Sequence, residues 1–408
     1  MSASSRQKVP NVSQHGFSSF RTDLFGRIKT SEPYTIFDST HRYQKSTDFS
    51  EESSGTASFT HLPNESSLRM SIGTASGDKA TLESYRVFPY QPGKSLQIMQ
   101  TFVMAPTKNN LRQRVGYFTR ENGFYLEQHG SLVYLVKRSY ISGEVVETRV
   151  PQSQWNIDTL NGEGPSDISL DLTKAQILWS EYEWLGVGSV RLGFAIDGFF
   201  IPVHAFHHAN YTTSVYMTTA SLPVRYEIEN TGATASVSAF KQICSSVIAN
   251  GGFFKSTETW TATKSSATVG TDYYPLVAIR MASGRTDSVI IPAEVNIFPT
   301  SADTFEWALI RNPASITGGS WVAHSPKNNV EYNTTATAIS GGTEILQGFF
   351  GAQNQSTTPM SDGDLRNFSL QLGRTNASPA VSDVVVLVAR VTAGTGTTKS
   401  SLGWFDIA

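Results

Sequence analysis

The stretch from Gln176 to Phe206 constrains the fold of this chain more than any other part, because it contains three strand-like runs separated by two turns. The first run extends to Trp184, and the glycines of Gly186–Gly188 then reverse the chain. The second run ends at Asp197-Gly198, a dipeptide that strongly favours a two-residue hairpin. Two turns separated by one strand length predict an antiparallel meander.

Short strand-like runs bounded by Gly, Pro or Asn continue along most of the chain. Among the clearest are Ser84–Tyr90, Leu96–Val103, Arg114–Phe118 and Phe124–Glu127. Asn122-Gly123 stands between the last two and predicts a hairpin, and a second hairpin is expected between 132–136 and 145–150. Because no stretch keeps a helical period for more than three turns, the sequence predicts an all-β protein.

The glycines that follow Asn250 divide the strand-like runs into two sets. Beyond them lie Tyr274–Arg280, Ser288–Phe298, Phe305–Ile310, Trp321–Ala323 and Asp383–Val391. The last run is apolar almost throughout, which predicts a strand buried on both faces. We expect two antiparallel β-sandwich domains of the lectin-like or jelly-roll-like type, over residues 31–250 and 251–408, after an extended N-terminal arm over residues 1–30.

Charge and cysteine content narrow the classes of function that we expect for this chain. Only 16% of residues are charged, against roughly 25% in an average soluble chain, and the formal net charge is -2. Neither nucleic-acid binding nor attraction to an anionic membrane is expected from this balance. No apolar run approaches the ~20 residues of a membrane helix, and the N-terminus has no apolar signal-peptide core. The single cysteine, Cys244, excludes an intrachain disulfide, and its apolar surroundings predict an inert core thiol.

Glu181 and Glu183 are the sharpest candidates for catalysis. Residues i and i+2 of a strand point to the same face about 6.6 Å apart, and a retaining glycosidase needs two carboxyls roughly 5–5.5 Å apart. Lectin-like hydrolases usually place a third acidic residue on the same strand, where this chain has Trp179. Solvent-facing glutamates opposite an apolar face are the simpler interpretation, and we expect no enzyme.

His204, His207 and His208 form the densest histidine group, and we expect surface or inter-subunit histidines there rather than a metal site. No nucleophile elbow, P-loop or dinucleotide-binding fingerprint occurs, so no cofactor is expected. The tryptophans could include a platform on which a sugar stacks. For each one singly, however, we expect packing in the core or contact with another subunit. They are Trp155, Trp179, Trp184, Trp260, Trp307, Trp321 and Trp404.

Several phrases of the sequence resemble structural proteins of tailed bacteriophages, especially marine ones. They are Phe25–Ser39, Trp184–Gly198, Leu222–Ile228, Gln242–Ile248, Gly284–Thr286 and Leu402–Trp404. The resemblance covers nearly the whole chain, but its motifs are strand-and-turn signatures that name no catalytic residue. It implies a virion component, made in the host cytoplasm without a signal peptide.

We carry three expectations for function, of which the first follows from the resemblance. The first is a non-enzymatic component of a tail, baseplate, fibre or capsid surface, with other virion proteins and copies of itself, in a trimer, as partners. Its arm would dock to the particle through Arg21, Phe25, Arg27 and Phe37. The second is a module that recognises a host-surface glycan, and the third is the hydrolase built on Glu181 and Glu183.

Overall fold

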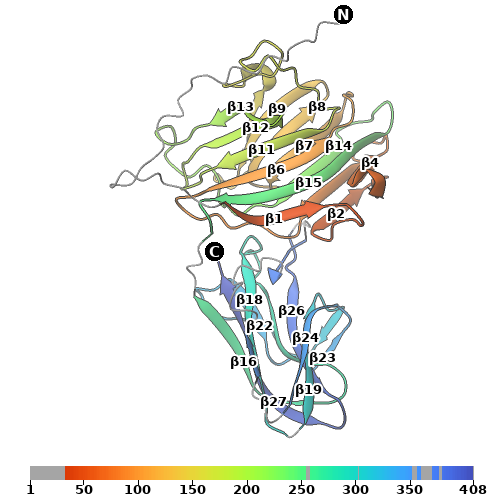
Figure 1. The fold of residues 1–408 in the computed structure, drawn as a ribbon, viewed down its shortest axis with the longest axis vertical. Helices are drawn as coiled ribbons and strands as arrows, with labels where there is room; N and C mark the ends of the chain where they lie inside the picture. The colour runs from red at the N-terminus through yellow and green to blue at the C-terminus, as the bar shows by residue number, and fades with distance from the viewer. Residues whose placement is uncertain are drawn as a thin grey trace, which may run out of the picture. The chain divides into compact units, whose positions relative to one another are not determined.

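The computed structural model describes residues 33–253, 258–301, 303–351, 356–359, 370–375 and 379–407 (Figure 1). The regular secondary structure of these residues is almost entirely β-strand, with two single-turn 3₁₀ helices at Pro63–Glu65 and Gln152–Gln154. No helix in this part of the chain is long and apolar enough to span a bilayer. The expected all-β class is therefore confirmed. The predicted arm, residues 1–30, lies outside the described residues.

The chain forms two compact units. Unit 1 comprises Met1–Ser84 and Tyr90–Phe253, and unit 2 comprises Tyr85–Pro89 and Phe254–Ala408. The sequence-based boundary after Asn250 did not anticipate that Tyr85–Pro89, which lies before it in the chain, belongs to unit 2.

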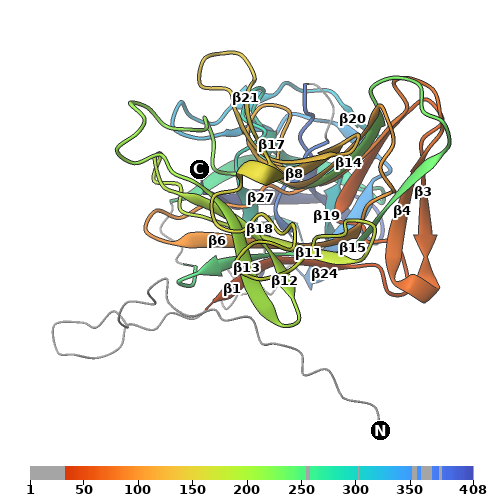
Figure 2. The same cartoon turned by 90° about the horizontal axis from the view of Figure 1, so that it is seen from above.

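Unit 1 contains an eight-stranded antiparallel sheet with the order β13-β12-β11-β6-β15-β4-β3, and β1 pairs with the far end of β15. The strands in this order are β13 (Phe199–Phe206), β12 (Val190–Ile196), β11 (Gln176–Tyr182), β6 (Ser95–Val103), β15 (Ser238–Asn250), β4 (Ser67–Ile72) and β3 (Ser58–Leu62), and β1 is Tyr34–Thr40. The predicted meander is confirmed as β11, β12 and β13 (Figure 2). Asp197 and Gly198 both have positive φ, 53° and 82°, as a type I′ turn requires.

The second sheet of unit 1 has seven antiparallel strands in the order β10-β9-β8-β7-β14-β5-β2. They are β10 (Val146–Pro151), β9 (Leu132–Ser139), β8 (Gly123–His129), β7 (Leu111–Phe118), β14 (Val224–Asn230), β5 (Lys79–Ser84) and β2 (Phe49–Ser54). Both predicted hairpins are confirmed, as β7–β8 and β9–β10. The run Ser84–Tyr90 was wrongly expected to be a strand. β5 ends at Ser84, and Pro89 has no N–H for a ladder.

Aromatic side chains fill the space between the two sheets of unit 1. Tyr182 of β11 packs against Tyr117 of β7 and Phe124 of β8, with ring centroids 5.7 and 5.2 Å apart. Tyr226 of β14 meets Phe240 of β15 at 6.0 Å. These contacts identify the inward face of each strand. Because side chains alternate along a strand, the intervening residues lie on the outer faces.

Unit 2 has a four-stranded sheet, a six-stranded sheet and a two-stranded sheet, all antiparallel. The first has the order β16 (Thr259–Val269), β27 (Gly396–Asp406), β18 (Ile290–Pro299) and β25 (Ser356–Pro359). The second has the order β21 (Val322–Ala323), β22 (Val330–Asn333), β17 (Tyr274–Met281), β26 (Val384–Val391), β19 (Thr304–Arg311) and β24 (Thr343–Gly351). The third pairs β20 (Ser315–Thr317) with β23 (Ala338–Ser340).

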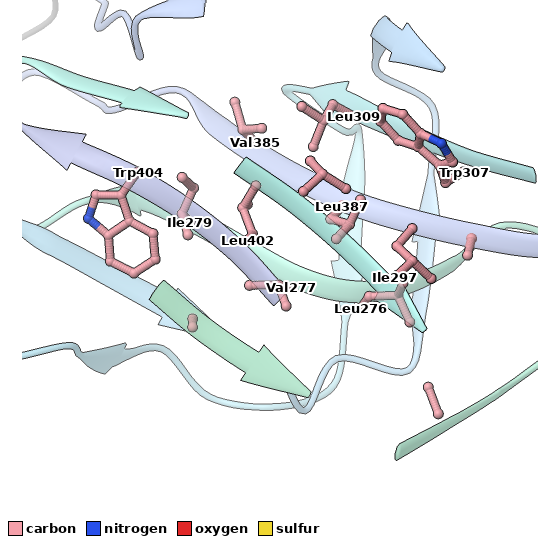
Figure 3. Packing of buried hydrophobic residues seen from close by; sticks show 14 of the residues in the cluster. Leu276, Val277, Ile279, Ile297, Trp307, Leu309, Val385, Leu387, Leu402 and Trp404 are labelled. Carbon is pink, nitrogen blue, oxygen red and sulfur yellow. The ribbon is translucent and has the colours of Figure 1, made fainter. Parts of the chain in front are cut away.

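The main core of unit 2 joins side chains of the four- and six-stranded sheets. Figure 3 shows Leu402 and Trp404 of β27 in the same cluster as Leu387 of β26. On the other face of β26, Val386 and Val388 are buried in a second cluster against which residues of the two-stranded sheet pack. The predicted burial of this strand on both faces is therefore confirmed.

Candidate functional site: the outer face of the eight-stranded sheet

Five side chains form what we call the sheet-face site: Gln97, Trp179, Glu181, Arg191 and Phe200. Each lies on the outer face of the eight-stranded sheet, as the alternation of side chains along the strands and the pairing between them require. The strand register places Glu181 directly between Gln97 of β6 and Arg191 of β12. Trp179 stands opposite Gly193 of β12, one step along the same face.

Trp179 and Phe200 form the aromatic part of the site. A Cβ added at Gly193 would come 2.6 Å from the Trp179 ring, so the indole lies over this glycine. Phe200 meets Trp179 edge to face, with ring centroids 5.8 Å apart and planes at 74°. Trp179 is only 6% exposed, and its Nε1 has no hydrogen-bond partner among the described residues, whereas Phe200 is 52% exposed.

The polar part of the site is built around the Glu181 carboxylate. One of its oxygens accepts a hydrogen bond from Arg191 Nη2 at 2.6 Å, and the other accepts one from Ser95 Oγ at 2.9 Å. Gln97 Oε1 accepts a hydrogen bond from Asn250 Nδ2 at 3.3 Å, which orients the Gln97 amide. The Arg191 side chain is 55% exposed. The face thus offers an accessible ring beside planar donors and acceptors held in fixed positions.

The sequence singled out Glu181 together with Glu183, and the structure places the two differently. β11 ends at Tyr182 rather than at the expected Trp184. Glu183 follows the strand, its side chain is exposed, and its backbone N–H donates to Ser189 O at 3.2 Å. Glu181 is engaged by Arg191 and Ser95. No contact in the described part of the chain joins the two carboxyls into the facing pair that the hydrolase requires.

The three clustered histidines have separate partners. Backbone Asn156 N donates to His204 Nδ1 at 3.2 Å, His207 Nδ1 lies 3.1 Å from Ser189 Oγ, and His208 Nδ1 donates to Gly188 O at 2.6 Å. The expectation of surface histidines is wrong for His204 and His208, which are 6% and 1% exposed. Within the described ranges, no three His, Cys, Asp or Glu side chains are grouped to hold a metal ion.

The sequence-based prediction that Cys244 is a core thiol was also wrong. A register shift in β15 between Gln242 and Cys244 places Cys244 opposite Thr101 on the outer face. Its Sγ lies 3.3 Å from Thr101 Oγ1, and the residue is half-buried rather than in the core. The mostly apolar stretch around it suggested burial, but an irregularity in the strand changes which face a residue occupies.

The outer face of the seven-stranded sheet carries a network of ion pairs that the sequence analysis missed. We call it the charge lattice: Glu83, Arg114, Glu127, Arg225 and Glu227, from β5, β7, β8 and β14. Arg114 pairs with Glu127 and with Glu227, each at 3.2 Å. Arg225 pairs with Glu227 at 2.8 Å and with Glu83. All five side chains are at most 6% exposed.

Strand register explains the charge lattice. Glu127, Arg114 and Glu227 stand directly opposite one another on β8, β7 and β14. In the next rank, Arg225 stands opposite Glu83. Opposite charges therefore alternate across the strands, where a cross-strand pair stabilises a sheet.

The chemistry of the charge lattice is that of fixed, ionised groups. Burial would raise the pKa of the Glu227 carboxyl, but Arg114, Arg225 and Lys79 together hold it well below its usual range. A carboxyl that stays ionised cannot donate a proton as a general acid near neutral pH. We therefore assign the lattice to the stability of the sheet.

The predicted assembly residues fall mainly outside the described part of the chain. Arg21, Phe25 and Arg27 lie there, and their role stays a prediction. Phe37 belongs to β1, is 2% exposed and packs edge to face against Phe49, with ring centroids 6.0 Å apart. Its side chain therefore contributes to the core of unit 1.

Comparison with known proteins finds similar solved structures but no related sequence. No protein family and no curated protein matches the sequence. Among solved structures, a Bacillus licheniformis β-glucanase is similar at 9% identity over 54% of this chain and 99% of its own, with a TM-score of 0.34. Winged bean acidic lectin is similar at 9% identity over 54% and 99%, with a TM-score of 0.31. The CBM2 module of the evolved Dit of Lactobacillus casei BL23 phage J-1 is similar at 6% identity over 55% and 100%, with a TM-score of 0.34.

Proposed function

We propose that this chain is a non-enzymatic glycan-recognition module and that the sheet-face site holds the sugar. The observation that carries the proposal is the Phe200–Trp179 pair. The exposed Phe200 ring packs edge to face on the buried Trp179 indole, beside the Glu181–Arg191 ion pair.

The chemistry of a pyranose matches this arrangement. One face of the sugar ring presents C–H groups, which pack on an aromatic surface such as Phe200, while its hydroxyls both donate and accept hydrogen bonds. Glu181 supplies acceptors, Arg191 supplies donors, and the Gln97 amide can supply both. The buried Trp179 indole supports the Phe200 ring from below and fixes its position.

A glycan array on the intact chain followed by calorimetric titration with the best-bound oligosaccharide tests the proposal. Phe200→Ala should reduce affinity at least tenfold, a loss of about 1.4 kcal/mol. The matched control is Phe349→Ala, because Phe349 is 69% exposed in unit 2 and has no place in the site. Absence of binding across the array, or equal affinities for the two variants, would reject the proposal.

The same titration separates recognition from hydrolysis. Under our proposal Glu183→Gln binds as the parent chain does, because Glu183 lies outside the site. Glu181→Gln should weaken binding, because it loses the ion pair with Arg191 that fixes the guanidinium. Release of reducing ends from the bound oligosaccharide by the parent chain and not by Glu183→Gln would favour the hydrolase instead.

We propose further that recognition takes place on the surface of a phage particle. The support is the sequence resemblance to virion proteins, which extends from Phe25–Ser39 to Leu402–Trp404. Deletion of residues 1–30 should abolish incorporation into particles while leaving glycan binding by the isolated chain unchanged. Normal occupancy of the truncated chain in purified particles would refute the docking role of the arm.

A further inference from the structure

His208 joins three segments of unit 1 that are distant in sequence. Its Nδ1 donates to Gly188 O in the β11–β12 turn at 2.6 Å, and its Nε2 lies 3.1 Å from Lys137 Nζ of β9. Its ring stacks on Tyr216 with centroids 3.8 Å apart and planes within 8°. The residue is 1% exposed.

These partners require a neutral imidazole in one tautomer. A backbone carbonyl only accepts, so Nδ1 must carry the proton toward Gly188. The ammonium group of Lys137 only donates, so Nε2 must be the unprotonated acceptor. A second proton on the His208 ring would therefore remove the bond to Lys137 and leave two cations in contact.

The segment from His208 to Tyr216 depends on this histidine for its attachment. Within it, the amides of Tyr211 and Thr212 both donate to His208 O, at 2.9 and 3.0 Å. At its far end, Tyr216 N donates to Gly186 O at 3.0 Å. The residues between are exposed, Tyr211 to 79%. Two ends thus hold the loop, and His208 is part of both, through Gly188 and through its contact with the Tyr216 ring.

We propose that His208 is an acid-sensitive latch, and that protonation of its Nε2 releases the loop 208–216 from β9 and from the β11–β12 turn. The charged and titratable groups that face it are Lys137 from β9, His207 from its own loop and Tyr216 across its ring. Lys137 is the group that opposes a second proton at short range. Its Nζ lies 5.8 Å from the centroid of the Phe206 ring, which adds a second contact for the ammonium group on this side of His208.

The energetics of protonation agree with this geometry. Burial lowers the pKa of His208 to about 4, and Lys137 and His207 act in the same direction against the Gly188 hydrogen bond. Burial also lowers the pKa of Lys137. An open loop returns His208 to water and to its ordinary value of 6.5. Opening therefore takes up a proton, and the open fraction rises as the pH falls below 6.5 and levels off near 4.

Amide hydrogen exchange of the full chain between pH 7 and pH 4, corrected for intrinsic rates, tests the latch. The Tyr216 amide should exchange faster by about ten- to a hundredfold at the acid end, because one proton is taken up on opening. The Leu126 amide, in the centre of β8, should not change. Equal acceleration of both amides would mean global unfolding and would overturn the proposal, as would a constant rate at Tyr216.

Two variants identify the group responsible. His208→Gln keeps an acceptor and donors but cannot titrate, so its exchange at Tyr216 should be independent of pH. His207→Gln, at the exposed neighbouring histidine, should keep the acid response, with only a small shift to higher pH because the weakest of the opposing charges is removed. Lys137→Met keeps the aliphatic stem and removes the opposing cation, so it should shift the response to higher pH by making protonation easier. A parent-like response in His208→Gln, or no shift in Lys137→Met, would refute the latch.

Discussion

Arg114 and Glu227 stand directly opposite each other on β7 and β14, and their side chains form a 3.2 Å ion pair on the outer face of the seven-stranded sheet. Both side chains are at most 6% exposed. Breaking one partner of such a pair is strongly destabilising, because the other charge is left buried without compensation. The charge lattice therefore makes sharp predictions about stability.

Arg225→Met should destabilise unit 1 by about 3–5 kcal/mol, because it leaves the buried carboxylates of Glu83 and Glu227 without their shared cation. Urea unfolding followed by circular dichroism at pH 7 measures the change. The matched control is Arg120→Met, which breaks the exposed ion pair with Glu52 and should cost less than about 1 kcal/mol. Equal losses in the two variants would contradict the structural role of the lattice.

Stability should decrease between pH 6.5 and pH 4 because of two buried histidines. Burial lowers the pKa of His204 and of His208 to about 4. In this range the unfolded chain binds more protons than the folded chain, so the unfolding free energy falls as the pH falls. Urea midpoints at pH 7.0, 6.0 and 5.0 measure the slope. His208→Gln should reduce the slope without abolishing it, because His204 still titrates, and His207→Gln should keep most of it because burial is the larger cause of both shifts. A midpoint that is constant over this range would disprove the assignment.

Gly193→Ala tests the packing of the sheet-face site. An added Cβ would lie 2.2 Å from Ile201 O and 2.6 Å from the Trp179 ring, so the indole must move. We expect a loss of about 1–3 kcal/mol from overpacking, together with a change in tryptophan fluorescence. Gly198→Ala is unsuitable as a comparison because that position has a positive φ, whereas Gly270→Ala meets open space and should have a small effect. A fluorescence spectrum identical to that of the parent chain would argue against the position of Trp179.

Asn122→Ala should cost about 2–4 kcal/mol, more than a turn residue usually does, because several buried hydrogen bonds of roughly 1 kcal/mol each are lost. Its Oδ1 accepts from the amides of Tyr140 and Thr218, and its Nδ2 donates to Thr218 Oγ1 at 2.7 Å. Asn122→Asp keeps the acceptor and should recover part of the loss. Thermal unfolding of Asn122→Ala and Asn122→Asp tests this role of the side-chain hydrogen bonds. If Asn122 were important only because asparagine favours the turn, the two variants would differ little in stability.

Local signals in the sequence predicted the parts of the fold that depend on neighbouring residues. Asn122-Gly123 and Asp197-Gly198 each indicated a hairpin. At Asp197-Gly198 both residues have the positive φ that the two-residue turn requires, whereas the β7–β8 loop spans residues 119–122 and only Gly123 at its end has a positive φ, 134°. The continuous apolar run of β26 likewise indicated burial on both faces. These inferences needed no knowledge of which strands pair across the sheet.

The features that escaped sequence analysis depend on partners far along the chain. Arg225 and Glu83 are 142 residues apart, and only the pairing of β14 with β5 brings them together. Lys137 and His208 are 71 residues apart, so the burial of His208 could not be read from its polar neighbourhood. The Arg-x-Arg of β7 and the Glu-x-Glu of β14 were visible, but their meaning required the register of the two strands.

The position of Tyr85–Pro89 in the chain has a consequence for recombination within the gene. They belong to unit 2, where Val87 and Phe88 are buried and Gln371 Nε2 donates to Val87 O at 2.8 Å. They are nevertheless encoded inside the stretch that specifies unit 1. On the ribosome they emerge long before the strands they will join. A recombination event that copied only the 3′ part of the gene would therefore yield a unit 2 without this segment.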